Sequence, residues 1–307
     1  MFRFIGPLLA LLSPFTPALV ACADEVPKPF KTLEVPGAHN VIQAAPNVYS
    51  GSEPEGEDTF RALAELGIKT IIRVDAGRSD LESSNKYGLN YFQVPIGYDG
   101  ISLESAAMLR RILLEQPGPF YIHCHHGKHR GPAMAALGLR LMETCDLATV
   151  LIFMKQAGTS TDYAGLWRDV GEVDSEKVKA AQVEIHERAP LAAVPAAMSE
   201  LDVRLDHLVL CQEAGWKTPV DHPDITPARE ALLLRQSLEA MVAEHIAGKG
   251  DYSTDARYGD MMKAALTASG KLHQAVEAAQ APEAEQLLSL VKKQCLDCHK
   301  LYRNPAK

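Results

Sequence analysis

The sequence predicts an α/β domain followed by an all-α four-helix bundle. The chain has 307 residues, which is long enough for two separate cores. Up to residue 173, short β-branched or aromatic runs alternate with helical patterns, which indicates a central, mostly parallel sheet with helices on both faces. From residue 193 to 307 the chain is rich in alanine and leucine at helical spacing. Residues 174–192 are charged and only loosely periodic, so we expect either a linker or a helix packed on the first domain.

The first domain is expected to begin with a strand near Val48 and a helix that ends at Gly67. The other expected strands cover residues 68–74, 91–95 and 119–122, and the other expected helices cover 102–115, 132–143 and 146–157. Asp146 is the expected N-cap of the last of these helices.

The second domain is expected to contain four amphipathic helices. Thr226 and Pro227 should begin the second helix, and Asp255 should lie near the start of the third. The inward-facing residues are expected to be Met198, Leu201, Leu205, Leu208, Leu234, Leu238, Met241, Met262, Leu266, Leu287, Leu288, Val291 and Cys295. Cys145 and Cys211 lie on apolar helical patterns, so we expect buried, inert thiols.

The N-terminus has the layout of a secretory signal. Arg3 precedes an apolar run, and residues 1–23 end in small residues. Cleavage after Ala23 would release a soluble periplasmic protein, whereas lipidation at Cys22 in a bacterial lipobox would anchor it to a membrane. Residues 24–36 are expected to form a tether. The formal charge of −8 makes nucleic acid an unexpected partner.

The chemistry of the first domain is concentrated between His123 and Arg130. An apolar strand precedes this loop and a helix with proline in its first turn follows it. Unpaired amides at a helix N-terminus bind anions. Cys124 is therefore expected to be a reactive thiolate, and the planar guanidinium of Arg130 can bind two phosphate oxygens.

This loop resembles the signature of the cysteine-dependent protein tyrosine phosphatases, which is His-Cys, five residues, then Arg. The segments 47–54 and 66–72 resemble the compact bacterial dual-specificity-like phosphatases, and the resemblance covers residues 37–173. It implies a phosphomonoester phosphatase of phosphotyrosine type that acts on a phosphorylated protein or small molecule through a phosphocysteine intermediate, and the N-terminal signal layout adds the expectation that it is exported.

The resemblance also implies roles for individual residues. His123 should order the loop, and Asp99, after the third expected strand, should be the general acid. The alternative for Asp99 is a turn cap beside Gly100, and Asp75 and Asp80 follow an earlier strand. The expected phosphate-binding residues are His125, His126, Gly127, Lys128, His129 and Arg130.

The loop departs from the family pattern in two ways. Gly131 stands where a Ser or Thr usually helps to release the phosphorylated cysteine. The additional histidines His125, His126 and His129 could form a solvated positive rim for phosphate or join Cys124 in a metal site. We favour the rim, because adjacent histidines on a tight loop should diverge.

The second domain ends with Cys295-Leu296-Asp297-Cys298-His299, the attachment motif for c-type haem. Two thiols at this spacing can bind the two vinyl groups, and His299 then becomes the proximal iron ligand. A zinc site is less favoured, since no second Cys/His pair follows. Export agrees with haem, because bacterial c-type haem is attached outside the cytoplasm.

A four-helix bundle with this motif in its last turns resembles cytochrome c prime and related low-spin cytochromes. The resemblance covers residues 193–307 and implies one covalently bound haem c. It places Met198 as the candidate distal iron ligand and Arg303 as a partner of a haem propionate. Met198 could instead be a core residue, and His207 is a more distant rival ligand.

Three functions therefore remain open. The first is a phosphatase that the haem domain regulates or holds in a complex with a redox partner. The second is an electron-transfer or gas-binding haem protein with a weakly catalytic, anion-binding module. The third is a redox protein in which Cys124 reacts with peroxide.

Overall fold

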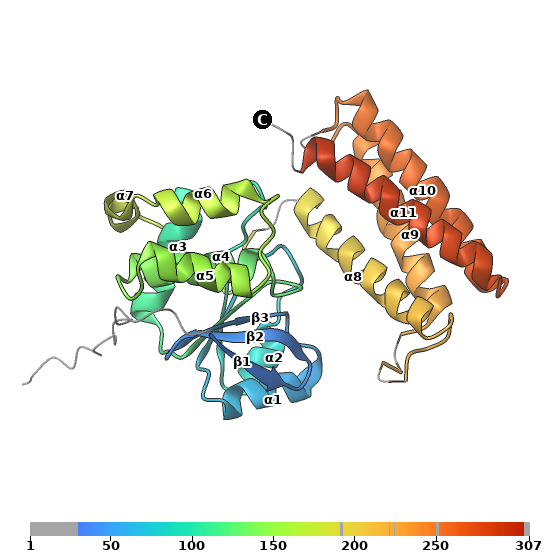
Figure 1. The fold of residues 1–307 in the computed structure, drawn as a ribbon. Helices are drawn as coiled ribbons and strands as arrows, with labels where there is room; N and C mark the ends of the chain where they lie inside the picture. Colours follow the sequence, from blue (N-terminus) through green and yellow to red (C-terminus); the bar gives the residue numbers. More distant parts are fainter. Residues whose placement is uncertain (1–29, 191–192, 221, 224, 250–251, 304–307) are drawn as a thin grey trace, which may run out of the picture.

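The computed structural model describes residues 30–190, 193–220, 222–223, 225–249 and 252–303. They form a sheet domain and a helical bundle that lie side by side (Figure 1). The expected signal peptide, the candidate lipidation site Cys22 and the first part of the expected tether lie outside the described residues.

The sheet has six strands in the order β1-β2-β3-β6-β4-β5. The strands are β1 (Lys31–Val35), β2 (Ala38–Ala45), β3 (Val48–Gly51), β4 (Thr70–Arg73), β5 (Asn90–Gln93) and β6 (Phe120–His123). Strands β3, β6, β4 and β5 are parallel, whereas β1 and β2 add antiparallel pairings at one edge. The sheet is therefore mixed: the expected parallel part runs from β3 to the edge strand β5, and the antiparallel pairings lie at the other edge.

Helices cover both faces of the sheet, as the sequence predicts. One face carries α1 (Gly56–Glu65) and α2 (Leu81–Lys86). The other face carries α3 (Leu103–Glu115), α4 (Arg130–Leu141), α5 (Leu147–Gln156), α6 (Ala164–Glu172) and α7 (Ser175–Ala180). Side chains alternate between the two faces along each strand. Ile71 of β4 thus packs in the core with Leu63 of α1, and Ile72 packs in the core with Leu137 of α4.

Several elements were not predicted. Residues 31–35 of the expected tether form the edge strand β1, and β2, α2 and α6 are also additional. Gln156 fixes the start of this region, since Phe30 N donates to Gln156 Oε1 at 2.8 Å and Gln156 Nε2 donates to Phe30 O at 2.7 Å. Polar edge strands lack the apolar runs that reveal a buried strand, which explains why β1 was missed.

The segment from residue 174 to 190 packs against the sheet domain. Val178 of α7 is buried in the main core, and Val183 packs against it. The backbone N–H of Gln93 donates to His186 O at 2.9 Å, and Arg111 Nη1 donates to Val183 O at 2.5 Å. Of the two expected alternatives, a helix packed on the first domain is the one found.

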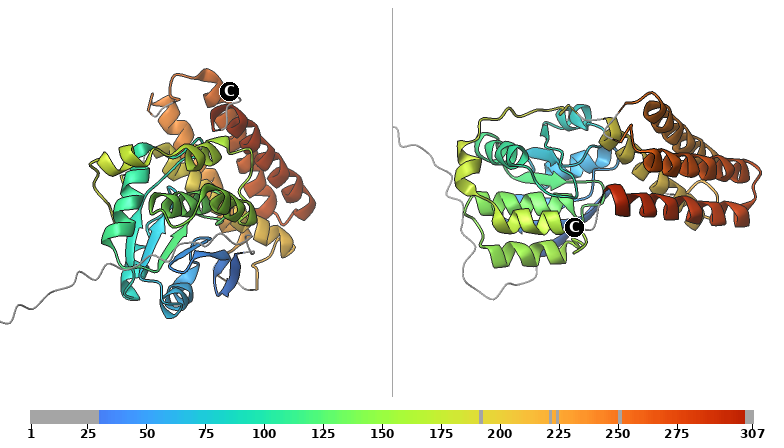
Figure 2. Two further views of the ribbon diagram at one scale, coloured as in Figure 1. Left: turned by 60° about the vertical axis from the view of Figure 1, so that its left-hand side comes forward. Right: turned by 90° about the horizontal axis from the view of Figure 1, so that it is seen from above.

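The helical bundle contains α8 (Ala193–Glu213), α9 (Pro227–Ile246), α10 (Ala256–Glu277) and α11 (Ala281–Tyr302). Thr226 is the N-cap of α9, and Asp255 caps α10 by accepting a hydrogen bond from Tyr258 N at 3.1 Å. Helix α8 lies on the side of the bundle that faces the sheet domain, and the C-terminal end of α11 approaches that domain (Figures 1 and 2).

Cys145 and Cys211, which lie outside both cysteine motifs, are in different chemical states. Cys211 is a buried free thiol, as expected, but Cys145 is disulfide-bonded, so the expectation of an inert thiol is wrong there. Within the described part of the chain, every helix is too short or too polar to cross a bilayer.

Candidate functional site

The loop after β6 forms an anion cradle. Cys124 follows the strand and is only 3% exposed, and α4 begins at Arg130. Among the described residues, the backbone N–H groups of His126, Lys128 and His129 donate no hydrogen bond. Free amides around a cysteine at a helix N-terminus can bind an anion such as phosphate.

Gly127 allows the loop to turn this tightly. Its φ is +66°, and a Cβ atom at this position would lie 2.3 Å from the carbonyl carbon of Gly51. A side chain would therefore collide with the end of β3. The turn is closed by Gly127 N, which donates to Cys124 O at 3.2 Å.

Asp75, which follows β4, fixes the cradle by accepting a hydrogen bond from a backbone N–H of the loop. Its carboxylate is fully buried; Oδ2 accepts from His125 N at 2.6 Å and Oδ1 accepts from Arg73 Nε at 2.6 Å. Burial would raise the pKa of Asp75, but the charges of Arg73 and Arg130 outweigh it and keep the pKa well below its usual range. Asp75 is therefore an ionised structural anchor and a poor proton donor.

Arg130 points into the loop beside Tyr98. Its Cζ lies 4.3 Å from the centre of the Tyr98 ring, and Nη2 lies 3.8 Å from Asp75 Oδ2. Its Nε atom is buried and has no hydrogen-bond partner in the described part of the chain. The guanidinium is thus held by a ring on one side and a carboxylate on the other, with donors left for a ligand.

The extra histidines do not form the expected solvated rim. His125 binds Glu53 through Nδ1 and Asp206 of α8 through Nε2, both at 2.7 Å. His129 Nδ1 accepts from Ser160 N at 3.2 Å, and burial lowers the pKa of His129 to about 4. His126 is exposed and lies against the His125 ring, with ring centres 4.4 Å apart. The expected divergence of the two adjacent histidines is therefore wrong.

His123 lies beneath the loop. It is fully buried, and neither ring nitrogen has a hydrogen-bond partner among the described residues. Burial, followed by the charge of Arg73, lowers the pKa of His123 to about 3, so the ring is neutral. The ring stacks on Tyr121 at 5.7 Å between centres, which places it as a packing support for the loop.

Gly131 is closely packed against the loop and against a hydroxyl of β3. A Cβ atom at Gly131 would lie 3.2 Å from Cys124 N and 3.3 Å from Ser50 Oγ. The Ser50 hydroxyl is buried and has no hydrogen-bond partner within the described residues. Strand β3 thus supplies a free hydroxyl close to where a side chain at position 131 would project.

Asp99 lies in the loop between β5 and α3, as predicted. It is exposed and lines one cavity together with Arg130 and Tyr98. Its backbone carbonyl accepts from Arg168 Nη2 at 3.3 Å, which ties this loop to α6. Asp99 and Arg130 thus border the same cavity, on which the predicted acid role of Asp99 depends.

The same cavity extends between the two domains. It encloses about 500 Å³, and its bundle lining includes Met198 of α8, Tyr258 of α10, and Cys295, Cys298 and His299 of α11. Both thiols are free, and the buried Tyr258 hydroxyl has no partner among the described residues. The sequence motif and the candidate distal residue therefore face one shared space.

Arg303, just after α11, reaches the sheet domain. Its Cζ lies 3.6 Å from the centre of the Tyr98 ring, the same ring that contacts Arg130. Arg303 Nη1 also lies 3.3 Å from His299 Nδ1. A chain of contacts thus connects the Cys-x-x-Cys-His motif with the anion cradle.

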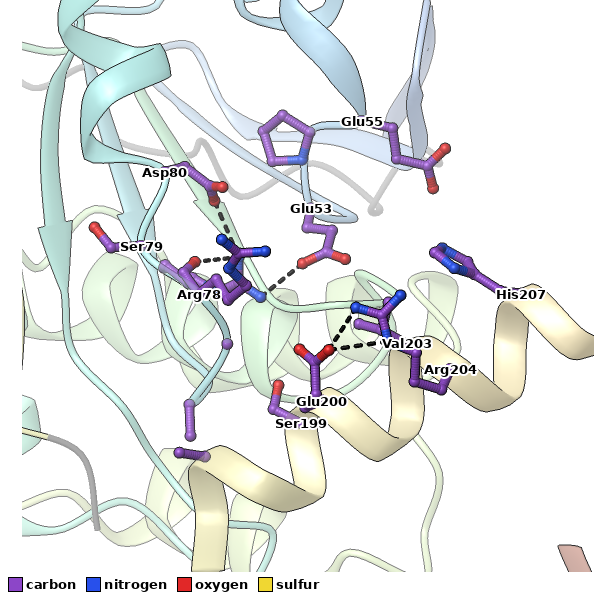
Figure 3. A pocket seen from close by; sticks show the side chains of 15 residues that line it. Glu53, Glu55, Arg78, Ser79, Asp80, Ser199, Glu200, Val203, Arg204 and His207 are labelled. Carbon is purple, nitrogen blue, oxygen red and sulfur yellow. Dashed lines mark hydrogen bonds and ion pairs between the residues drawn. The ribbon is translucent and has the colours of Figure 1, made fainter. Parts of the chain in front are cut away.

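A second cavity of about 520 Å³ lies on the other side of α8. In Figure 3, Glu200 and Arg204 of α8 face Glu53 and Asp80 of the sheet domain across it. His207 Nδ1 lies 2.9 Å from the buried Glu230, which also binds Arg204 at 2.8 Å. This pairing makes His207 a structural residue of the bundle and not a rival iron ligand.

Sequence reasoning missed four residues that shape the site: Ser50, Glu53, Tyr98 and Asp206. Each comes from an element remote in sequence from the Cys124 loop. No local spacing connects them with the motif, so only the tertiary fold could reveal them.

No family model and no curated protein matches the chain. Its fold is similar to that of solved phosphatase structures. The core catalytic domain of the PP-IP phosphatase SIW14 from S. cerevisiae, in complex with citrate, is 20% identical over 48% of this chain and 93% of its own, with a TM-score of 0.42. P. aeruginosa TpbA is 20% identical over 47% of this chain and 96% of its own, with a TM-score of 0.39. A TpbA variant in complex with pTyr is 18% identical over 49% of this chain and 93% of its own, with a TM-score of 0.41. The activity of this chain has to be derived from its own residues.

Proposed function

We propose that the chain is a cysteine-dependent phosphomonoester phosphatase. One observation carries this proposal: free loop amides surround Cys124 at the start of α4, with the Arg130 guanidinium beside them. This arrangement provides a nucleophile, a site for three phosphoryl oxygens and a clamp for two of them.

The reaction would proceed in two displacements at phosphorus. In the first, Cys124 Sγ forms a bond to phosphorus, the bond to the leaving oxygen breaks, and Asp99 donates a proton to that oxygen. In the second, water attacks phosphorus, Asp99 accepts a proton from the water, and the S–P bond breaks to release phosphate and the thiolate. Arg130 and the loop amides stabilise the charge in both steps.

The proposal can be tested by measuring the rate at which the chain hydrolyses a small aryl phosphate. Cys124→Ser should abolish turnover, because an alcohol in this cradle is a far weaker nucleophile than a thiolate. Cys211→Ala is the matched control, since Cys211 is also a buried free thiol but lies in α8. Full activity in Cys124→Ser would exclude the phosphocysteine route.

We also propose that the bundle carries one covalently bound haem c. The lining of the shared cavity supports this: both thiols of the motif are free, and Met198 lies on the α8 side. The volume of about 500 Å³ lies within the range of small-molecule and cofactor pockets. Cys295 and Cys298 would hold the group, His299 would bind the iron, and Met198 is the candidate opposite ligand. When bound, the group would supply one-electron transfer or gas binding.

Export is part of the same proposal. Covalent attachment of bacterial c-type haem takes place outside the cytoplasm, and the N-terminal sequence has a secretory layout. Mass spectrometry of the native N-terminus distinguishes a start at Asp24 from a diacylated Cys22; retention of Met1 would contradict both.

We further propose that the haem domain regulates the phosphatase. The supporting contact is Tyr98, whose ring contacts the guanidiniums of both Arg130 and Arg303. Arg303 is the expected partner of a haem propionate. A change in the charge of the haem would therefore change the contact of Arg303 with Tyr98 and, through Tyr98, the position of the Arg130 guanidinium. Coupling between two sites is reciprocal in binding free energy.

This coupling has two readouts. The affinity for inorganic phosphate should differ between oxidised and reduced haem, and phosphate should shift the haem midpoint potential. Arg303→Ala should remove both effects, whereas Arg257→Ala, an exposed site on α10, should retain them. If phosphate leaves the potential of the native chain unchanged, the two sites act independently.

The alternative function is an electron-transfer or gas-binding haem protein whose sheet domain only binds anions. Gly131 favours it, because a hydroxyl that usually assists phosphocysteine breakdown is missing there. Phosphate binding without turnover in the native chain would select this alternative.

A further inference from the structure

Three potential metal ligands from the two domains converge beside the cradle. His125 and His126 come from the loop after β6, and Asp206 comes from α8. One donor atom from each lies within 4.8 Å of the others. The two imidazoles and the carboxylate are brought together only by the packing of α8 against the sheet domain.

The spacing of the donor atoms suits a small divalent ion. Asp206 Oδ2 lies 2.7 Å from His125 Nε2 and 3.7 Å from His126 Nδ1. Zinc binds imidazole nitrogen and carboxylate oxygen at about 2.0 to 2.2 Å, so two ligand atoms on a tetrahedral ion lie about 3.3 Å apart. The two observed distances lie on either side of that value, and side-chain movements of about half an ångström would bring both donors to it.

Glu53 supplies the outer support that a metal-binding histidine usually has. Its Oε1 atom lies 2.7 Å from His125 Nδ1, so the imidazole is oriented with Nε2 directed toward Asp206. Glu53 is fixed in turn by Arg73, whose Nη2 donates to Oε2 at 2.6 Å. His125 Nε2 also lies 2.7 Å from the Asp206 carboxylate and donates to it, so metal binding would release the Nε2 proton to solvent while Glu53 keeps its hydrogen bond to Nδ1.

We propose that His125, His126 and Asp206 bind one divalent transition-metal ion of the zinc class. The donors are His125 Nε2, His126 Nδ1 and Asp206 Oδ2, and water would complete the tetrahedral coordination. Two imidazoles and one carboxylate are ligands that zinc, cobalt and nickel accept and that calcium and magnesium do not prefer.

The site would act as a clamp between the domains. Two ligands belong to the phosphate-binding loop and the third to the helix that carries Met198. The side chains of His125 and His126 engage α8, while the His126 amide is free to face the cradle. Metal binding would therefore fix the position of α8 over the loop without occupying the anion site.

Zinc binding by isothermal titration calorimetry tests the proposal. The titration uses the full chain with its haem and the Cys124→Ser substitution, so that the catalytic thiolate cannot bind zinc. Asp206→Asn should remove one equivalent of zinc or weaken its binding at least about tenfold. Asp206 is 42% exposed, so this near-isosteric change should not disturb the fold.

Asp202→Asn is the matched control. Asp202 lies one turn earlier on α8 and is 43% exposed, and its Oδ2 atom lies 3.9 Å from the other nitrogen of His126. It should bind zinc like the parent, because it is outside the set of converging donors. If the two variants weaken zinc binding equally, only general electrostatic attraction is present and the proposal is wrong.

A second measurement separates a metal site from a simple ion pair. Zinc should slow hydrogen exchange in both α8 and residues 124–130 of the parent, since the ion connects them. His126→Gln should lose this protection in both segments. If zinc protects neither segment of the parent, His125 and Asp206 form an interdomain ion pair only, and the proposal is overturned.

Discussion

The anion cradle around Cys124 and the cavity beside the bundle are built in different ways. Backbone amides form the cradle, and buried charges such as Asp75 and Arg73 hold them in place. The cavity is formed by side chains on the faces of α8, α10 and α11, and it is open toward the sheet domain. The first site is thus preorganised by its own domain, whereas the second is completed by its neighbour.

This difference predicts which substitutions will affect each site most strongly. The cradle should respond strongly to changes in its buried charges and nucleophile, because its geometry depends on few strong contacts. The cavity should respond mainly to groups at the domain boundary, where Tyr98 and Arg303 meet.

The largest effect is expected for Asp99→Asn. An amide cannot donate a proton to the leaving oxygen, so turnover should fall by about two to four orders of magnitude. The loss should be greatest for phenyl phosphate and smaller for nitrophenyl phosphate, whose leaving group needs less protonation. Asp260→Asn, an exposed change on α10, is the control. Equal losses for both substrates would mean that Asp99 only caps the turn beside Gly100.

Asp75→Asn should destabilise the sheet domain. The change keeps the shape of the side chain but removes a buried charge that pairs with Arg73 and accepts from His125 N. Breaking such a pair should cost about 3 kcal/mol of unfolding free energy, measured by chemical denaturation. Asp58→Asn, an exposed partner of Arg61, should change stability by less than about 1 kcal/mol. A loss in Asp75→Asn no larger than in this control would contradict the anchoring role.

Both motifs could be predicted from the sequence because they are local. The strand, the loop and the helix around Cys124 follow one another in the chain, and so do Cys295, Cys298 and His299. Tyr98 and Asp206 could not be assigned, because their roles depend on how the bundle packs against the sheet. The histidines were misjudged for the same reason: His125 and His126 lie against carboxylates from remote segments, and His129 accepts from the backbone N–H of Ser160.

The smallest effect is expected for Ser50→Ala. Its hydroxyl has no partner among the described residues and lies 3.3 Å from where a Cβ atom at Gly131 would be, so we expect it to take the place of the usual hydroxyl and donate to the sulfur that leaves during phosphocysteine hydrolysis. Loss of a hydrogen bond of about 1 to 1.5 kcal/mol should slow that step about five- to tenfold. Rapid mixing should then show a burst of released phenol followed by a slower steady rate than in the native chain.

Ser84→Ala is the matched control for this experiment. Its hydroxyl is likewise buried without a partner among the described residues, but it lies in α2. It should leave the burst and the steady rate unchanged. If Ser50→Ala also leaves the burst and the steady rate unchanged, Ser50 has no part in the hydrolysis of phosphocysteine.

The covalent intermediate tests the central claim most directly. The native chain is mixed with an aryl phosphate, quenched in acid within the burst, and digested for mass spectrometry. The account predicts one phosphoryl group on the peptide that contains Cys124, and none on that peptide in Cys124→Ser. Turnover of the substrate with no phosphoryl group on Cys124 at any quench time would contradict it.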